Sequence, residues 1–113
     1  MLKEKDIQKT IISWLTIQEN AGKLIFLRFN SFSGQIIRAN GSKGYIKNNK
    51  KGAPDIIIFL PNGNYLCAEI KGYRCRLSSD QMAFKDKVDT LCGYYQVIYS
   101  LDELIITIDL ING

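Results

Sequence analysis

The spacing of hydrophobic residues along the chain predicts helices and strands in alternation. Residues 3–20 carry apolar side chains at helical spacing, and Ala21-Gly22 follows as a stop signal, so we expect a first helix there. The β-branched and aromatic run Leu24–Asn30 predicts a strand. Two further runs, Asp55–Leu60 and Tyr65–Lys71, are apolar at odd and even positions alike. This pattern is typical of strands that are buried on both faces at the middle of a sheet.

A capping motif predicts a helix after these strands. Ser78 is placed as the N-cap, and Gln81, three residues further on, as the side chain that reaches back to it. We expect Leu77 to pack on Met82 across this cap. The helix should run to about Cys92 and bury one face, which is formed by Phe84, Val88 and Leu91.

The remaining segments complete one domain over residues 1–113. Tyr94–Tyr99 predicts a strand, and Ser100–Glu103 has the form of a second cap that opens a final helix. Residues 31–53 are rich in Ser, Gly, Asn and Lys, with an Asn40-Gly41 turn that suggests a small hairpin or flap. The predicted order is therefore α, β, flap, β, β, α, β, α.

The loop between the two central strands decides which of their residues face each other. In a three-residue loop, Pro61 suits the first central position of a type I turn, and Gly63 the left-handed position that follows. That loop places Asp55 directly opposite Glu69. A two-residue loop at Asn62-Gly63 would instead turn the two carboxylates to opposite sides of the sheet. We therefore predict that the carboxylates face each other.

Two opposed carboxylates on buried strands need a positive partner. Their β-carbons would lie about 5 Å apart, where like charges repel. A hard divalent cation with oxygen ligands fits this requirement, and Mg²⁺ is the ion we expect. Lys71 projects from the same face as Glu69 and can offer a positive charge to an attacking water or a phosphate oxygen. A neutralising pair of acid and lysine at the end of the sheet is the structural alternative.

Composition excludes several kinds of chemistry. The 113 residues include no histidine, which excludes Ser-His-Asp hydrolysis, H-E-x-x-H zinc sites and histidine-based nucleases. The three cysteines form no C-x-x-C pair, so we interpret them as reduced thiols. No secretory signal or membrane-spanning run is visible, which predicts a cytosolic protein with no membrane partner.

The net charge of +4 hides a strong asymmetry along the chain. No acidic residue lies between Glu19 and Asp55, whereas that stretch holds seven positive charges. A segment that carries only positive charge is typical of a surface that binds a polyanion such as nucleic acid. A solvated basic loop is the alternative.

Three motifs together resemble the PD-(D/E)XK nuclease superfamily and, within it, the stand-alone VRR-Nuc domains of phages and bacteria. The motifs are Gly52-Ala53-Pro54-Asp55, Glu69-Ile70-Lys71-Gly72 and Leu77-Ser78-Ser79-Asp80-Gln81. The resemblance implies an α/β, restriction-endonuclease-like αβββαβ core with a mixed central sheet flanked by helices. It also implies hydrolysis of DNA phosphodiester bonds with Mg²⁺, for which Mn²⁺ can substitute, and no organic cofactor. Small stand-alone members resemble Holliday-junction resolvases, which implies a homodimer acting on branched DNA in the cytosol of a bacterium or a phage-infected host.

By position, the resemblance assigns roles to the central residues. Asp55 and Glu69 become the metal ligands, with the backbone carbonyl of Ile70 as a third. Lys71 becomes the residue that orients or activates the attacking water. Glu4 matches an N-terminal acid of the family that joins the catalytic and metal-binding set. An ordinary first-turn acid, favoured by the helix dipole, explains Glu4 as well.

Further roles come with alternatives of their own. Gln81 matches a helix glutamine that could hydrogen-bond the catalytic site, although the capping box explains it equally well. The expected DNA contacts are polar and basic residues that lie at the end of the first strand and in the flap: Arg28, Asn30, Ser31, Arg38, Lys43, Lys47, Lys50 and Lys51. Solvated polar residues at a strand end are the alternative for the first three of these.

Two departures from the family narrow the expected substrate. The chain has no Val-Arg-Arg tripeptide, although Gly-x-Pro-Asp and Glu-x-Lys are intact. It also shows no added recognition domain, which favours structure-selective cleavage over sequence-specific cleavage. The alternatives are a nickase, a flap nuclease or a restriction-type nuclease with the same site, a non-catalytic nucleic-acid-binding module of the same fold, and a structural phage protein. Apolar residues on the last helix are a candidate dimer interface, namely Leu104, Ile105, Ile106 and Ile108.

Overall fold

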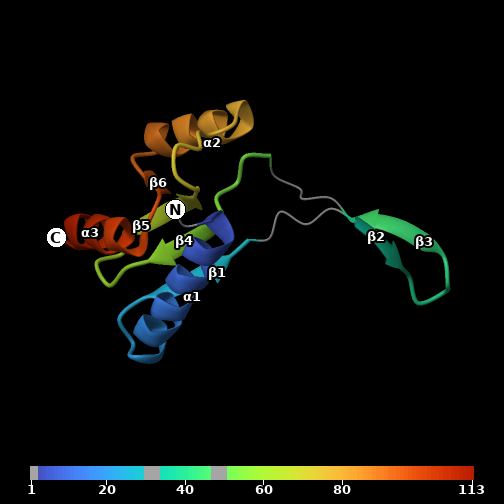
Figure 1. Cartoon of the computed structure of the whole chain (residues 1–113), viewed down its shortest axis with the longest axis horizontal. Coiled ribbons are helices and arrows are strands. Elements are labelled where there is room, and N and C mark those ends of the chain that lie inside the picture. Colours follow the sequence, from blue (N-terminus) through green and yellow to red (C-terminus); the bar gives the residue numbers. More distant parts are fainter. Residues whose placement is uncertain (1–2, 30–33, 47–50) are drawn as a thin grey trace.

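The computed structural model describes residues 3–29, 34–46 and 51–113, and Figure 1 shows how their helices and strands are arranged. In chain order the elements are α1 (Glu4–Asn20), β1 (Ile25–Arg28), β2 (Gly34–Ile37), β3 (Lys43–Ile46), β4 (Ile56–Phe59), β5 (Tyr65–Ile70), α2 (Ser79–Thr90), β6 (Tyr94–Ile98) and α3 (Leu101–Asn112). This order confirms the expected α/β fold, with a hairpin of β2 and β3 inserted into an αβββαβ core. Within the described residues, no helix is both long enough and apolar enough to cross a bilayer.

The main sheet is mixed, with the strand order β1-β4-β5-β6. Strand β4 runs antiparallel to β1 and β5, whereas β6 runs parallel to β5. Helix α2 is the crossover that a parallel pair requires. Residues 66–70 of β5 are buried, as expected for a central strand, but Phe59 at the end of β4 is 42% exposed. Burial on both faces is therefore confirmed for β5 and wrong for the end of β4.

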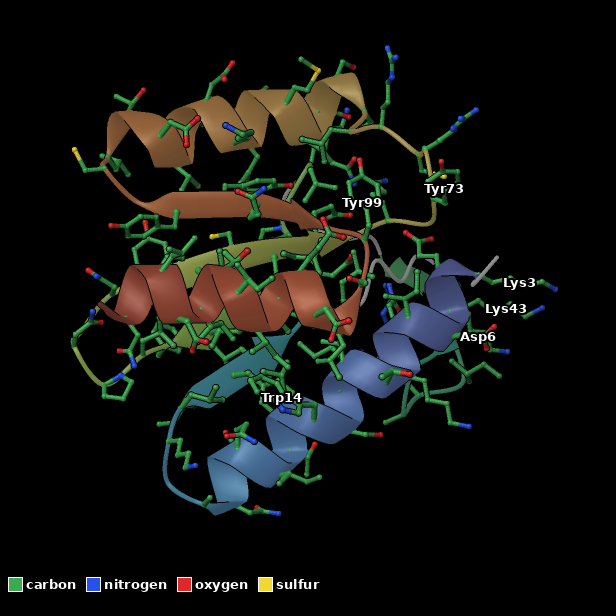
Figure 2. All side chains as sticks on the ribbon, turned by 60° about the vertical axis from the view of Figure 1, so that its left-hand side comes forward. Lys3, Asp6, Trp14, Lys43, Tyr73 and Tyr99 are labelled. Carbon is green, nitrogen blue, oxygen red and sulfur yellow. The ribbon has the colours of Figure 1, made fainter. Side chains whose placement is uncertain are left out.

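Helices cover the two faces of this sheet unequally. Helices α1 and α3 lie on one face, where Trp14 packs at the margin of the core (Figure 2). That core is built from aliphatic side chains, among them Ile7, Ile11, Leu15, Ile56, Ile58, Ile70, Leu104 and Ile108. Helix α2 covers the other face beside β5 and β6, where Val88 packs with Cys67 and Tyr95.

Part of the second face lies outside the cover of α2. Ile25 pairs with Phe59 across β1 and β4, and Leu27 lies two residues further along the same face. All three of these side chains are exposed. We call this surface, which consists of Ile25, Leu27 and Phe59, the β1–β4 apolar face.

Two expectations about helix burial are wrong. Of the apolar residues expected in an exposed interface on α3, Leu104 and Ile108 are buried because α3 packs beside α1 on the sheet, whereas Ile106 is exposed as expected. Leu91 was expected on the buried face of α2, but the helix ends at Thr90, and Leu91 is 77% exposed. Met82 is exposed as well, whereas Leu77 packs against the core beneath α2.

The loop between β4 and β5 adopts the three-residue form that was predicted. The Leu60 amide donates to the Asn64 carbonyl at 2.9 Å, and Gly63 takes a left-handed φ of 86°. The register pairs Ile56 with Ala68. One step further along the same register, Asp55 lies opposite Glu69, as predicted.

The capping box of α2 is also confirmed. The Gln81 amide donates to Ser78 Oγ at 3.2 Å, and the Ser78 amide donates to Gln81 Oε1 at 2.8 Å. Gly52, with a left-handed φ of 77°, passes directly beside this cap. A β-carbon on Gly52 would lie 2.0 Å from the carbonyl oxygen of Asp80 and 2.9 Å from the amide nitrogen of Gln81. The glycine of the Gly-x-Pro-Asp motif is therefore needed for close packing against α2.

The inserted hairpin stands apart from the main sheet in Figure 1. Its turn confirms the predicted Asn40-Gly41 position, because Asn40 Oδ1 accepts from the Ser42 amide at 2.9 Å and Gly41 has a φ of 85°. Arg38 Nη1 donates to the Lys43 carbonyl at 2.8 Å across the base of this turn.

We predict that Gly52→Ala destabilises the protein more than Gly63→Ala does. Both glycines have a left-handed φ, so each alanine should carry a backbone penalty of about 1–2 kcal/mol. Only at Gly52 does the added β-carbon also meet backbone atoms of α2, whereas at Gly63 it meets open space. Urea unfolding of the two variants measures the difference, and equal losses of stability would contradict this explanation of the motif.

Candidate active site

A cleft of about 340 Å³ opens where β4 begins and β5 ends. Its polar lining consists of Glu4, Gln8, Arg28, Asp55, Glu69, Lys71 and Gln81. The five side chains predicted to be catalytic therefore line one cleft, although they come from α1, the start of β4, the end of β5 and α2. Ile70, whose carbonyl was predicted as a metal ligand, lines it too.

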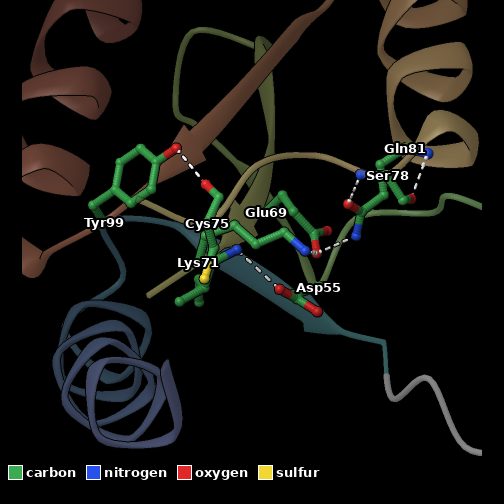
Figure 3. Close-up of polar contacts among 8 residues, drawn as sticks. Asp55, Glu69, Lys71, Cys75, Ser78, Gln81 and Tyr99 are labelled. Atoms are coloured by element: carbon green, nitrogen blue, oxygen red, sulfur yellow. Dashed lines mark hydrogen bonds and ion pairs between the residues drawn. The ribbon is translucent and has the colours of Figure 1, made fainter. Parts of the chain in front are cut away.

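Glu69 lies at the centre of this cleft and is only 4% exposed. Its Oε1 accepts a hydrogen bond from Gln81 Nε2 at 2.8 Å and lies 4.0 Å from Lys71 Nζ (Figure 3). Its Oε2 is buried and has no hydrogen-bond partner among the described residues. A buried carboxylate oxygen without a partner is unfavourable, because it has lost water and gained nothing in exchange. This atom is available to a ligand that carries positive charge.

Asp55 is fixed beside Glu69 by backbone contacts on both sides. Its Oδ2 accepts from the Ile70 amide at 2.9 Å, so the carboxylate reaches across to the strand that carries Glu69 (Figure 3). Its own carbonyl accepts from the Phe29 amide at 2.7 Å, which ties it to the end of β1. The carboxylate position thus follows from the backbone of three neighbouring strands.

The electrostatics of the cleft disfavour two ionised carboxylates. Burial and, after it, the neighbouring charge of Asp55 together raise the pKa of Glu69 to about 8, although Lys71 opposes the shift. Burial also raises the pKa of Asp55, while the hydrogen bond from the Ile70 amide acts in the opposite direction. A cation between the carboxylates would let both ionise. The donor set of two carboxylates fits a hard divalent ion.

Glu4 occupies a different position from the two central acids. Within residues 3–29, 34–46 and 51–113, no group of three or more acidic or cysteine side chains lies close enough together to hold a metal ion. Helix α1 packs on the face of the sheet that carries Ile70, whereas Glu69, the adjacent residue on the strand, points to the opposite face. Glu4 is exposed and lines the cleft from that other side. Its role as a metal ligand stays a prediction.

Gln81 serves both of the roles that the sequence left open. Its Oε1 completes the capping box with Ser78, and its Nε2 holds Glu69. The start of α2 is therefore coupled to the orientation of the central carboxylate. Gln8, one helical turn after Glu4, also lines the cleft and was not predicted as a site residue. The i, i+4 spacing from Glu4 was the signal that could have identified it.

The predicted DNA contacts fall into three groups. Arg28 lines the cleft itself. Arg38 and Lys43 lie exposed on the hairpin, and Lys51 lies exposed in the turn before β4. The other predicted contacts lie outside the described residues: Asn30, Ser31, Lys47 and Lys50.

The raised pKa of Glu69 predicts a specific dependence of stability on pH. In the metal-free folded protein this carboxyl holds its proton up to about pH 8, whereas the unfolded chain releases it near the ordinary value of 4.5. Stability should therefore fall as the pH rises between these two values. Glu69→Gln cannot ionise, so it should gain stability relative to the wild type over this range. Urea unfolding in EDTA across the range measures this gain, and a difference between the two proteins that does not change with pH would contradict it.

The sequence was compared with protein families, curated proteins and solved structures. A family model described as the VRR-NUC domain matches residues 2–100. These residues include every element from α1 to β6 and all residues that line the cleft. No curated protein and no solved structure matched the chain. The family match covers most of the chain, and the chain belongs to the VRR-NUC domain family.

Proposed function

We propose that this nuclease-type domain is a Mg²⁺-dependent endonuclease that hydrolyses phosphodiester bonds in branched DNA. The observation that carries the proposal is the buried Oε2 of Glu69, which has no partner in the described part of the chain and lies in a cleft shared with Asp55 and Lys71. Membership of the VRR-NUC family supports the same class of activity.

In this proposal, Asp55 and Glu69 hold the ion, with the Ile70 carbonyl as a third ligand. When bound, Mg²⁺ would supply charge stabilisation on the phosphate and lower the pKa of a bound water. A cleft of about 340 Å³ has the volume of roughly ten waters, at about 30 Å³ each, and accommodates a hydrated ion with one phosphate group. Mn²⁺ prefers similar oxygen ligands and should substitute for Mg²⁺.

The other residues of the cleft position the reacting groups. Lys71 Nζ lies 4.0 Å from Glu69 Oε1, from where its charge can hold an attacking water or a phosphate oxygen. Gln81 fixes Oε1 of Glu69 and leaves Oε2 to the ion. Arg28, on the α1 side of the cleft, is placed to contact the phosphate of the bound strand.

Affinity for DNA would come from basic residues outside the cleft. Arg38 and Lys43 on the hairpin, and Lys51 before β4, are exposed and can meet phosphates of the duplex arms. Contacts of this kind depend on salt and carry no sequence information. We therefore propose that the enzyme selects the shape of its substrate, with a four-way junction as the preferred shape.

We also propose that the protein acts as a homodimer. The β1–β4 apolar face exposes three large hydrophobic side chains side by side, and such patches mark interaction surfaces. A twofold dimer would present two clefts symmetrically, so that both strands of a junction can be cut. Two of the α3 residues first considered for an interface, Leu104 and Ile108, are buried, so we place the interface on the β1–β4 apolar face.

The central prediction concerns cleavage of a panel of labelled DNAs. Asp55→Asn, Glu69→Gln and Lys71→Ala should each lower Mg²⁺-dependent cleavage by about a hundredfold or more, because each removes a group that acts at the phosphate. Asp89→Asn, which changes an acid on the exposed side of α2, is the matched control and should cleave normally.

The panel consists of duplex, flap, splayed-arm and four-way-junction DNA, each with Mg²⁺, Mn²⁺, Ca²⁺ and EDTA. We expect junction cleavage with Mg²⁺ or Mn²⁺. Full activity in Asp55→Asn would refute the proposed site. Cleavage of flaps or nicking of duplex alone would assign a different substrate, and DNA binding without any cleavage would indicate a non-catalytic module.

The dimer is tested by placing a charge on the β1–β4 apolar face. Leu27→Glu should convert the protein to monomers, because a buried unpaired carboxylate in the interface is strongly unfavourable. Leu110→Glu, at an exposed position on α3, is the matched control and should leave the dimer intact. Light scattering after gel filtration measures the mass. A monomeric wild type, or a dimer that survives Leu27→Glu, would contradict the proposed interface.

A further inference from the structure

The loop that joins β5 to α2 carries exposed chemistry that the proposed active site does not use. We call residues 72–77 the β5–α2 loop. Tyr73, Arg74 and Arg76 are all exposed in it, and the loop contains no acidic residue. The ion pairs found in the described residues involve neither arginine. An exposed aromatic ring beside cationic side chains is a surface on which single-stranded nucleic acid can bind.

This loop is held in one conformation by one hydrogen bond of its own and one from Tyr99. The Cys75 amide donates to the Gly72 carbonyl at 3.0 Å, and the Tyr99 hydroxyl donates to the Cys75 carbonyl at 2.9 Å (Figure 3). Arg74 has a left-handed φ of 66°, which is uncommon for a residue other than glycine. Such a conformation persists only where its surroundings enforce it. The side chains of the loop are therefore presented on a fixed backbone.

Tyr73 and Arg74 lie in contact and stay exposed to solvent. The Arg74 guanidinium carbon lies 5.2 Å from the centroid of the Tyr73 ring, within the range of a cation–π contact. Tyr73 nevertheless stays 57% exposed, and Figure 2 shows it at the margin of the molecule. A ring that is open to solvent and supported by a cation can accept the face of a nucleobase.

The loop begins at the cleft. It follows directly after Lys71, and three residues of chain span at most about 11 Å, so Arg74 lies within that distance of Lys71. A β-carbon on Gly72 would lie 3.6 Å from the amide nitrogen of Glu4, which places the start of the loop against the rim formed by α1. At about 3.4 Å per nucleotide along one strand, Tyr73 is within roughly three nucleotides of a phosphate in the cleft.

We propose that the β5–α2 loop binds an unpaired nucleotide next to the phosphate in the cleft. The base stacks on Tyr73, and Arg74 and Arg76 contact the flanking phosphates. Bases inside an intact duplex are already stacked on both faces, so the loop favours DNA in which a base close to the cut is unpaired or has lost a stacking neighbour, as at the branch point of a junction. This inference rests on the proposed function, since it requires that the cleft takes a DNA phosphodiester.

The test measures binding without cleavage. Wild type, Tyr73→Ala and Tyr73→Phe are titrated in EDTA with an intact duplex and with the same duplex carrying a three-nucleotide gap, by fluorescence anisotropy. Tyr73→Ala should weaken binding of the gapped DNA by roughly fivefold to a hundredfold and leave duplex binding unchanged. Tyr73→Phe keeps the ring and should bind like the wild type. Tyr94→Ala, which removes another exposed tyrosine on β6, is the matched control.

A second readout reports stacking directly. With 2-aminopurine at the unpaired position, binding of wild type or Tyr73→Phe should quench its fluorescence, and binding of Tyr73→Ala at saturation should not. Arg76→Ala should lower the slope of log affinity against log salt concentration for gapped DNA by the equivalent of about one phosphate contact. Lys87→Ala, in the last turn of α2, is the control and should leave this slope unchanged.

The outcomes separate this inference from the proposed function. If Tyr73→Ala keeps the preference for gapped DNA and the quenching, the role of the loop is overturned, while cleavage results for Asp55 stand unaffected. If the preference depends on Tyr73 but no metal supports cleavage, the hydrolytic function is overturned and the binding site stands. If the wild type shows no preference for gapped DNA, the inference is overturned as well.

Discussion

The structure depends on one electrostatic constraint, which is that two carboxylates are held together at the end of a buried sheet. Glu69 is almost completely buried, and Asp55 is fixed beside it by the Ile70 amide. Because burial and mutual repulsion raise the pKa of Glu69 to about 8, the pair is unfavourable in its ionised form unless a cation joins it. The tight loop at Gly63 sets the register, and the contact of Gly52 with α2 places Gln81 against Glu69.

Much of the fold follows from local signals that need few neighbours to be effective. The turn residues between β4 and β5 predicted the pairing of Leu60 with Asn64, and the capping box predicted the start of α2 at Ser79. Burial was harder to predict, because it depends on which elements pack together. The apolar stripe of α3 has the same sequence pattern whether the helix packs beside α1 on the sheet or lies exposed, and only the structure shows that Leu104 is buried.

In the site, too, local motifs could be predicted from the sequence, whereas features that depend on packing could not. Asp55 and Glu69 lie on either side of a short loop, so their opposition could be predicted from turn chemistry, whereas Gln81 was linked to them only by resemblance. Glu4 could be assigned only by resemblance, since the chain does not say that α1 packs on the face opposite the Glu69 side chain. Tyr73 and its neighbouring arginines resemble ordinary solvated surface in the sequence. Their significance comes from a fixed loop at the rim of the cleft, which no local pattern reveals.

The most direct test of the account is calorimetric titration of Mg²⁺ into the wild type and Glu69→Gln at neutral pH, in buffers of different ionisation enthalpy. If the carboxylate pair needs a cation, the wild type should bind Mg²⁺ and release protons, because a Glu69 that is protonated at this pH must ionise to become a ligand. Glu69→Gln should bind far more weakly and release none. Equal binding by both proteins, or no binding by the wild type, would contradict a requirement of the carboxylate pair for a cation.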